Sequence, residues 1–401
     1  MSRPGPRTSR HGSLDLPAPP AELAELSAAL WTRIVKEIER GGPMPFRRYM
    51  EMALYEPGHG YYVNGLHKFG AAGDFITATE QGALFGIALA GWLDHLSASL
   101  DLADGDGWTL LELGPGSGAL ARTLLESLER PPARMLLLEP SAALREVQRE
   151  TLAALPESLG RRVEWIDRPP EAPFDGAVIG NEVIDALPVE RVRFGPSGPL
   201  RDVLEIDTEG PDWAGRAIDA RLGEAIARIE ADLDAPLGDG YHTEVCVDLP
   251  DWLRTVTAPL RRGAVLLADY GYPRREYYHP DRSGGTLVCQ YRHRAHFDPL
   301  LWPGLTDLSA FVDFTAVADG LIDAGLELAG FTTQAGFLLG SGILDRLEAV
   351  EDERERLELA GEFKRLALPG EMGEKFKLIA ATRNLAAPSA PFLLADHRGR
   401  L

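Results

Sequence analysis

The sequence predicts an α/β fold in which a doubly wound parallel sheet is covered by helices on both faces. Three observations favour it. From Trp108 onward, short apolar strands alternate with amphipathic helices, as in parallel sheets. The first of these strands runs through a turn with three glycines directly into a helix. Two stretches, 189–206 and 284–314, break the alternation, and we interpret them as insertions or caps over the sheet.

A helical extension is expected before the sheet. Apolar residues repeat at three- and four-residue steps over 23–38, which predicts a helix ended by Gly41-Gly42. A second helix is expected over Phe46–Tyr55. The Gly- and Tyr-rich stretch 57–74 that follows is interpreted as a binding surface, because a loop of this length and composition is seldom a plain linker.

Five apolar segments are expected to be strands of the sheet. The helix after the second is predicted to be capped by Ser141, and another helix is expected around 252–260. Near the C-terminus we expect one helix over 344–366 and a last strand over 376–381. The five strands are Thr109–Leu113, Met135–Leu138, Val163–Ile166, Ala177–Ile179 and Val265–Ala268.

These elements divide the chain into four parts. The first is broken up by prolines and is predicted to be disordered, and the residues after Asn384 are expected to be loose. Within the insertions, Val189–Phe194 and Leu200–Ile206 are expected to pair as an antiparallel hairpin. The parts are a tail (1–20), the helical extension (21–100), the core (101–385, with insertions around 189–245 and 273–315) and a C-terminal tail (386–401).

Composition excludes several classes of function. The 401 residues carry 41 Lys and Arg against 61 Asp and Glu, a net charge of -20, which argues against nucleic acid or an anionic membrane as the main partner. The most apolar run, 83–93, is far shorter than the ~20 residues of a membrane helix. Cys246 and Cys289 give neither a disulfide framework nor the spacing of a metal site, which favours a cytoplasmic protein without a metal.

The clearest local motif is the glycine turn after the first strand. Glu112, Gly114, Gly116 and Gly118 stand at alternate positions, and glycine is needed where the backbone takes positive φ or a ligand approaches closely. A dinucleotide fold spaces its glycines GxGxxG, whereas here the spacing is GxGxG. The pattern resembles the first motif of class I S-adenosylmethionine-dependent methyltransferases. The alternative is that these glycines only make a tight turn.

Two acids follow later strands at corresponding places. Glu139 closes the second strand, 21 residues after Gly118, where a carboxylate can accept hydrogen bonds from both ribose hydroxyls. Asp167 comes just after the third strand and could face the adenine amino group. The alternative is that both are solvated ends of strands.

The fourth strand ends in Asn181, Glu182 and, three residues further on, Asp185. Ligands of doubly wound sheets sit at the carboxyl ends of the strands, so this segment should border the transferred methyl group. Two carboxylates could clamp a guanidinium or an amine and align its lone pair with the methyl carbon. The alternative is that Asp185 caps a short helix and Glu182 faces solvent. We therefore take all three as candidate catalytic residues.

Several further motifs are spread along the chain between about Phe46 and Ala381. They are Phe46-Arg47-Arg48-Tyr49-Met50, Gly60-Tyr61-Tyr62, Lys68 to Phe75, Asn181 to Pro188, Asp269-Tyr270-Gly271-Tyr272, Gly285-Thr286-Leu287, Tyr291 to His296 and Asp313-Phe314. Through these motifs the chain resembles the MidA family of methyltransferases. The resemblance implies a class I methyltransferase core, which is Rossmann-like, with an N-terminal helical extension and family-specific insertions. The mitochondrial members of that family are associated with methylating an arginine of a respiratory complex I subunit.

The resemblance also implies that Gly73 and Asp74 lie at the cofactor pocket. The chain departs from the family pattern in two places. Residues 78–82 read Ala-Thr-Glu-Gln-Gly, where the family usually has Ala-Pro-Glu, an aliphatic residue and Ser. Ser309 stands where Thr is usual and Phe311 where His or Trp is common. These departures concern the substrate more than the cofactor.

Three functions remain open from sequence. The first is a protein arginine methyltransferase that uses S-adenosylmethionine, with a complex I subunit as one candidate substrate. The second is an O- or N-methyltransferase of a small molecule or peptide, and the third is an assembly factor that binds S-adenosylmethionine and holds a client protein. His293 and His296 have two possible roles, as a general base or as structural residues within a packed insertion. The flanking arginines favour the structural role. A homodimer also remains open.

Overall fold

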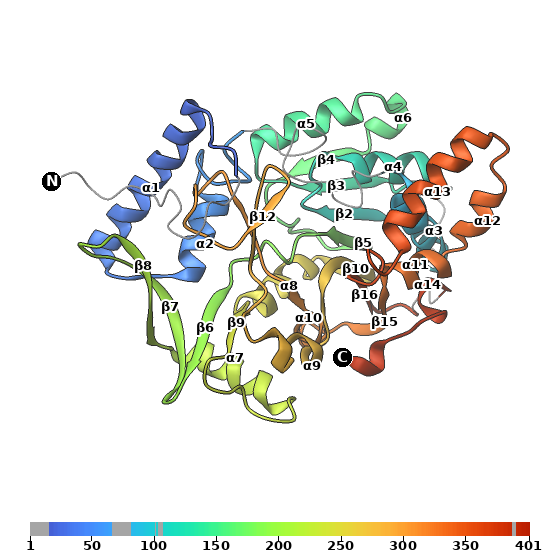
Figure 1. Ribbon diagram of the computed structural model, residues 1–401. Coiled ribbons are helices and arrows are strands. Elements are labelled where there is room, and N and C mark those ends of the chain that lie inside the picture. The colour runs from blue at the N-terminus through green and yellow to red at the C-terminus, as the bar shows by residue number, and fades with distance from the viewer. Residues whose placement is uncertain (1–15, 66–81, 101, 103–106, 387–389) are drawn as a thin grey trace.

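The computed structural model describes residues 16–65, 82–100, 102, 107–386 and 390–401. At its centre lies a twisted sheet with helices on both sides (Figure 1). The five predicted strands are all present and neighbouring members run parallel. In spatial order the main strands are β15 (Glu327–Thr333), β16 (Phe376–Arg383), β10 (Leu260–Tyr272), β5 (Phe174–Asn181), β2 (Thr109–Leu113), β3 (Arg134–Leu138) and β4 (Val163–Ile166), and β14 (Val312–Asp313) pairs with the end of β10.

The prediction of a parallel sheet is wrong at one edge. β16 runs antiparallel to both β10 and β15, between which it lies. Its residues are buried on both faces of the sheet, and the stretch 376–381 is apolar except for Lys377. Such a run identifies a central strand without giving its direction, which is why the sequence did not reveal the reversal.

Alternate residues of the strands supply two separate cores. Leu110 faces one side and packs with helices α3 (Leu84–Ser99) and α4 (Ala119–Ser127). Leu111 faces the other side and packs with α8 (Leu249–Thr257) and α10 (Phe314–Asp323). Because alternate side chains of each strand point to opposite faces, both faces of the sheet are buried. The carboxyl ends of the strands remain as the place where ligands can bind. The run 83–93, considered above only as a membrane segment, is the buried start of α3.

The insertions build a second sheet beside the first. The predicted hairpin is confirmed, because β6 (Glu190–Gly195) and β7 (Gly198–Ile206) pair antiparallel. Its neighbours are β1 (Met44–Pro45), β8 (Pro211–Ala217) and β9 (His242–Val245). A third small sheet contains β11 (Val288–Tyr291), β12 (Arg294–His296) and β13 (Asp307–Ser309).

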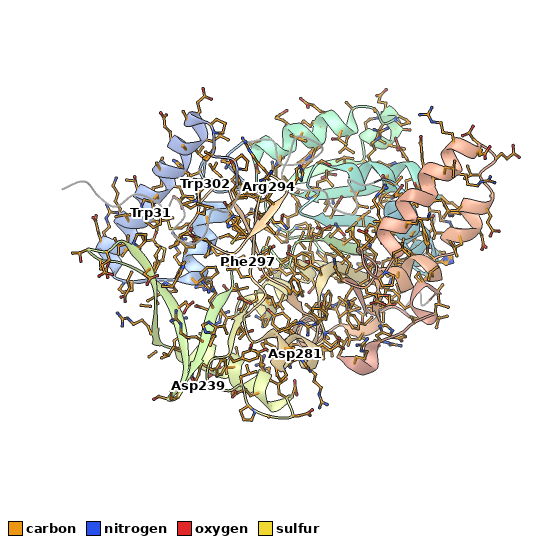
Figure 2. The ribbon with its side chains drawn as sticks, viewed as in Figure 1. Trp31, Asp239, Asp281, Arg294, Phe297 and Trp302 are labelled. Atoms are coloured by element: carbon orange, nitrogen blue, oxygen red, sulfur yellow. The ribbon has the colours of Figure 1, made fainter. Side chains whose placement is uncertain are left out.

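The N-terminal helices pack on these insertions. The predicted helices are confirmed as α1 (Ala21–Gly41) and α2 (Phe46–Tyr55), and their apolar faces share a core with residues of β7 and β13. Figure 2 shows Phe297 just after β12, where it is 77% exposed. The remaining elements are α5 (Ala142–Leu152), α6 (Glu157–Gly160), α7 (Ala220–Ala231), α9 (Arg274–Tyr277), η2 (Pro280–Arg282) and α11 (Gln334–Gly340).

Two C-terminal predictions are wrong. The single helix over 344–366 is two helices, α12 (Ile343–Glu348) and α13 (Glu353–Ala367), because Asp352 caps a new helix with its side chain. The residues after Asn384 are not loose, since the described ones form α14 (Ala390–Leu393) and η3 (Arg398–Arg400). Phe392 is buried against Phe337, and burial of one aromatic ring is enough to hold a short segment in place.

Residues 1–15, which cover most of the predicted disordered tail, lie outside the described residues. Among the helices of the described ranges, none combines the length and apolar character needed to cross a membrane.

Candidate functional site

A cavity of about 450 Å³ opens at the carboxyl ends of β2, β3 and β5. This volume lies in the range of sites for small molecules and cofactors. The carboxyl edge of parallel strands is where the sequence predicted ligands to bind. Its walls include the glycine turn (Gly114–Ser117), the end of β3 (Leu138–Pro140), the segment 181–187, the tyrosines Tyr55, Tyr61 and Tyr62, and Trp252, Thr255 and Val256 of α8.

The glycine turn has the predicted backbone conformation. Gly114, Gly116 and Gly118 have φ of 58°, 56° and 85°, a backbone region that residues other than glycine seldom adopt. A Cβ on Gly114 would lie 2.9 Å from Cγ1 of Val183, which is too close. The turn therefore requires glycine for its conformation and, at Gly114, for space. It brings bare backbone against the cavity directly before the N-terminus of α4.

Glu112, at the end of β2, is a buried acid at the floor of the cavity. Its side chain is 2% exposed, and burial raises its pKa to about 8. Oε2 finds no hydrogen-bond partner among the described residues. A carboxyl group in this position favours a ligand that donates hydrogen bonds or carries a positive charge, such as an ammonium group.

Glu139 is held by its own neighbourhood with its carboxylate at the cavity wall. Oε1 accepts the N–H of Ser141 at 2.8 Å and Oε2 accepts Nε2 of Gln148 at 3.2 Å. The same Nε2 donates to the carbonyl of Gly116 at 2.9 Å, and Oε1 of Gln148 accepts from Trp165 at 2.9 Å. Gln148 thereby links the acid to the glycine turn. Sequence reasoning missed Gln148, although it follows the predicted cap Ser141 by two helical turns.

Asp167 lines the same cavity beside Arg168 and Pro169 and is exposed. It therefore lies at the rim, beyond the buried Glu139. Gly73 and Asp74 lie outside the described residues, as do residues 78–81 of the stretch 78–82 that departs from the family pattern.

The three candidate catalytic residues come together at the end of β5, and each lines the cavity. Nδ2 of Asn181 donates to Oε1 of Glu182 at 3.2 Å. Glu182 has φ of 53°, a left-handed conformation that is rare for a residue with a side chain. The chain then makes a turn, closed by the N–H of Leu187 on the carbonyl of Ile184 at 3.0 Å, and no helix begins there. Asp185 is therefore not a helix cap, and Glu182 is half-buried and does not simply face solvent.

Asp185 belongs to a buried cluster that sequence reasoning missed. Its side chain is 5% exposed, and burial raises its pKa to about 6, although hydrogen bonds from the Tyr270 hydroxyl and from backbone N–H groups lower it. Asp269 lies beside it and is fully buried, and burial together with the charge of Asp185 raises the pKa of Asp269 well above its ordinary value. Sequence reasoning placed Asp269 and Tyr270 in a family motif but gave them no role in the site. Both directly follow the predicted strand Val265–Ala268, so the rule that identified Asp185 could have assigned them one.

Tyr55 and Tyr62 form an aromatic wall across from these acids. Their rings stack at 5.6 Å with 22° between the planes, and the Tyr55 hydroxyl donates to the carbonyl of Ala186 at 2.9 Å. Tyr55 is 37% exposed as a whole residue, but its hydroxyl lies inward against Ala186. Burial of the hydroxyls, and the nearby carboxyls of Asp307 and Asp185, raise the pKa of both tyrosines. Both hydroxyls are therefore neutral at physiological pH.

His293 and His296 do not line this cavity. His296 is buried in β12, where its Nδ1 accepts the N–H of Asp298 at 3.4 Å and burial lowers its pKa. His293 lies in the turn between β11 and β12 with φ of 60°. This placement agrees with a structural role for both.

The described residues fit the predicted cofactor, S-adenosylmethionine. The glycine turn leaves backbone accessible, Glu139 presents an acid for ribose hydroxyls, and the orphaned carboxyl of Glu112 matches an amino group. These features suit a nucleoside joined to an amino acid better than a pyrophosphate, which would bring further negative charge to the carboxylate of Glu139.

Comparison with known proteins also indicates S-adenosylmethionine as the cofactor. Residues 88–332 match the model of the family Methyltransf_28, described as S-adenosyl-L-methionine-dependent methyltransferase. A mitochondrial protein of Bos taurus, "Protein arginine methyltransferase NDUFAF7", is 28% identical over 90% of this chain and 85% of its own length. Its Drosophila melanogaster homologue is 29% identical over 90% of this chain and 88% of its own.

Solved structures include a similar protein with a ligand. A crystal structure of a Burkholderia thailandensis protein bound to S-adenosyl-homocysteine has a TM-score of 0.89. It is 40% identical and covers 96% of this chain and 100% of its own. A native structure from the same organism has a TM-score of 0.85 at 39% identity, over 96% of this chain and 100% of its own.

Proposed function

Because this chain belongs to the Methyltransf_28 family of S-adenosyl-L-methionine-dependent methyltransferases, we propose that it transfers the methyl group to an arginine nitrogen of a protein. Family membership confirms the predicted class I methyltransferase fold, the enzyme class and the cofactor. The observation that carries the proposal is the pair Glu182 and Asp185, two acids that border the same cavity as the glycine turn. Two carboxyls match the fork of a guanidinium.

The proposed cofactor contacts come from this chain's own residues. Glu139 accepts the ribose hydroxyls, and Glu112 binds the amino group of the methionine moiety. The glycines 114, 116 and 118 admit the cofactor close to the backbone, and Asp167 faces the adenine from the rim. Gly73 and Asp74 complete the pocket in this proposal. The geometry of Glu112 and Glu139 supports the first two contacts most directly.

The chain's own groups position the acceptor and move one proton. The cofactor supplies a methyl carbon on a sulfonium, whose C–S bond breaks with its electron pair on sulfur as the N–C bond forms. Glu182, oriented by Asn181, and Asp185 hold the guanidinium so that one nitrogen faces the cavity. That nitrogen sheds a proton, which passes to the carboxylate of Asp185. Tyr55 and Tyr62 cover one side of the cavity next to the reacting atoms.

The acceptor is proposed to be a cationic segment of a protein. The net charge of -20 favours the approach of such a segment. The Bos taurus and Drosophila melanogaster relatives are named as protein arginine methyltransferases, which supports the same acceptor here. A respiratory complex I subunit is one candidate substrate. Those relatives are named as mitochondrial, whereas the free cysteines Cys246 and Cys289 led us to propose a cytoplasmic location for this chain.

A small-molecule acceptor is the second candidate. Phe311 stands where the MidA family commonly has His or Trp, and its ring packs edge-on against Tyr270 at 5.1 Å, next to Asp185. A changed residue so close to the acceptor side favours a changed acceptor. Methylation of a small amine or hydroxyl would then replace methylation of a protein.

One experiment separates these candidates. The purified protein is incubated with S-adenosylmethionine labelled in the methyl group and with a soluble extract of a strain lacking its gene. The proposal predicts label in protein, recovered as methylarginine after acid hydrolysis, and loss of the same methylarginine from the strain's proteins by mass spectrometry. Label only in small molecules supports the second candidate. Cofactor binding by calorimetry without any transfer favours the assembly-factor alternative.

A further inference from the structure

The turn that carries the two acceptor-site acids is held from the neighbouring strand. Oδ2 of Asp269 accepts the N–H groups of Ile184 at 2.9 Å and Asp185 at 3.2 Å, and Oδ1 accepts the N–H of Tyr270 at 2.9 Å. Glu182, whose φ is 53°, also donates its N–H to the carbonyl of Ala268 at 2.8 Å. A left-handed residue persists only where its surroundings impose the conformation. The end of β10 supplies these surroundings.

The next residue of β10 contacts the carboxyl of Asp185 directly. The hydroxyl of Tyr270 is hydrogen-bonded to Asp185 and also to the hydroxyl of Ser309 on β13. Phe311 and Phe376 pack edge-on against the Tyr270 ring at 5.1 and 5.6 Å, so the ring is fixed in place. Since tyrosine donates to a carboxylate most strongly when that carboxylate is ionised, Tyr270 stabilises the charged form of Asp185.

We propose that Asp269 and Tyr270 are positioning residues for the methyl acceptor. Asp269 fixes the turn that holds Glu182 and Asp185, and Tyr270 sets the proton affinity of Asp185. This inference rests on the proposed role of Asp185 as the group that receives the proton. Asp185 must be ionised before transfer and protonated after it, so its proton affinity decides the pH at which the acceptor site works.

Tyr270 and Asp269 are linked to Asp185 in different ways. The Tyr270 hydroxyl lowers the pKa of Asp185 by hydrogen bonding. The charge of Asp185, in turn, raises the pKa of Asp269, which burial raises further. The described titratable groups that surround this pair are Tyr55 of α2, Tyr62 of the following turn, Tyr270 of β10, and Glu182, and beyond the two tyrosines Asp307 of β13.

Sinefungin provides a probe that needs no acceptor. It is an analogue of S-adenosylmethionine in which a carbon bearing an amine replaces the sulfur and its methyl. Calorimetry on the full chain gives its Kd relative to that of S-adenosyl-homocysteine, which lacks the amine, from pH 5 to pH 7.5. In the unaltered protein, the preference for sinefungin should rise about tenfold as Asp185 ionises and pairs with the amine. The midpoint of that rise should lie at about pH 6.

The variants should affect different properties of the site. Tyr270→Phe removes the donor to ionised Asp185 and should raise the midpoint by about 1 pH unit. Ser309→Ala weakens the same donor indirectly and should raise it by less. Asp269→Asn replaces one of the oxygens that hold the turn, and it should reduce the preference for sinefungin at every pH while leaving the midpoint nearly unchanged. A merely structural role for Tyr270 and Ser309 would loosen the site in their variants as well and leave the midpoint unshifted.

Tyr241→Phe is the matched control. It removes one tyrosine hydroxyl bond, 3.1 Å to the carbonyl of His279, and Tyr241 does not line the cavity. Its midpoint should equal that of the unaltered protein. Unshifted midpoints in folded Tyr270→Phe and Ser309→Ala overturn the positioning role, even if Asp269→Asn fails to fold. If the preference of the unaltered protein for sinefungin does not change with pH, the role of Asp185 as proton acceptor is wrong as well. The proposed arginine methylation is tested separately, by the labelling experiment.

Discussion

The two walls of the cavity differ in how their polar groups are held. On the wall proposed to bind the cofactor (the cofactor wall), Glu139 is fixed by Ser141 and Gln148, at most nine residues away in sequence. On the wall proposed to bind the acceptor (the acceptor wall), Asp185 is tied to a strand 84 residues further along the chain. The proposed cofactor site therefore depends on local structure, while the proposed acceptor site depends on how distant segments pack. Substitutions on the two walls should affect different steps, and the following predictions test that separation.

The largest effect is expected on the acceptor wall. Glu182→Gln keeps the size of the side chain and one acceptor oxygen but loses the charge that a guanidinium needs. Turnover should fall by ~10² or more while cofactor affinity stays nearly unchanged. Calorimetry measures the affinity, and single-turnover transfer into the labelled protein acceptor measures the rate.

The control for this variant is Glu171→Gln, which changes an exposed acid of the same type. Circular dichroism should show that both variants fold. If Glu182→Gln loses cofactor binding and keeps its turnover at saturating cofactor, Glu182 belongs to the cofactor wall and the separation is wrong.

A smaller effect is expected on the cofactor wall. Glu139→Ala removes a charged acceptor for the ribose hydroxyls and should weaken binding of S-adenosylmethionine by roughly ten- to a hundredfold. Turnover at saturating cofactor should change little. Glu150→Ala, on the exposed side of α5, is the matched control for loss of one acid. Equal losses of affinity in both variants would show that net charge, and not the ribose contact, decides binding.

The same difference between the walls explains what the sequence could predict. Glu112 and the glycine turn stand at the end of one strand and Glu139 at the end of the next, so a cofactor role for them could be predicted from spacing alone. The strand ends also identified Glu182 and Asp185. Their support by Asp269 depends on β5 and β10 being neighbours, which is a property of strand order and not of any local pattern. The direction of β16 could not be predicted for a related reason. It is set by the pairing of β16 with β10 and β15, which the apolar pattern of a buried strand does not reveal.

The buried acids should also make stability depend on pH. The folded pKa of Asp185 is raised to about 6 from an ordinary value of 3.8, so its favourable contribution is complete below pH 3.8 and is lost as pH rises through 6. Asp185→Asn does not titrate. Relative to the unaltered protein, this variant should gain about 2 kcal/mol of unfolding free energy between pH 4 and pH 7. Urea denaturation of both proteins at pH 4 and pH 7 measures the difference in their unfolding free energies. If this difference is the same at both pH values, Asp185 is ionised in the folded protein at both.

The smallest expected effect tests the contact between the tyrosine wall and the acceptor wall. Tyr55→Phe keeps the ring stacked on Tyr62 but leaves the carbonyl of Ala186 without its 2.9 Å bond, which should lower stability by about 1 kcal/mol. Because Ala186 directly follows Asp185, the loosened segment should weaken sinefungin about two- to fivefold and leave S-adenosyl-homocysteine unchanged. Tyr241→Phe, which loses a comparable hydroxyl bond away from the cavity, should lower stability without altering either ligand. Equal weakening of both ligands by Tyr55→Phe would show that the tyrosine wall serves the cofactor, and that the two walls are not separable at this point.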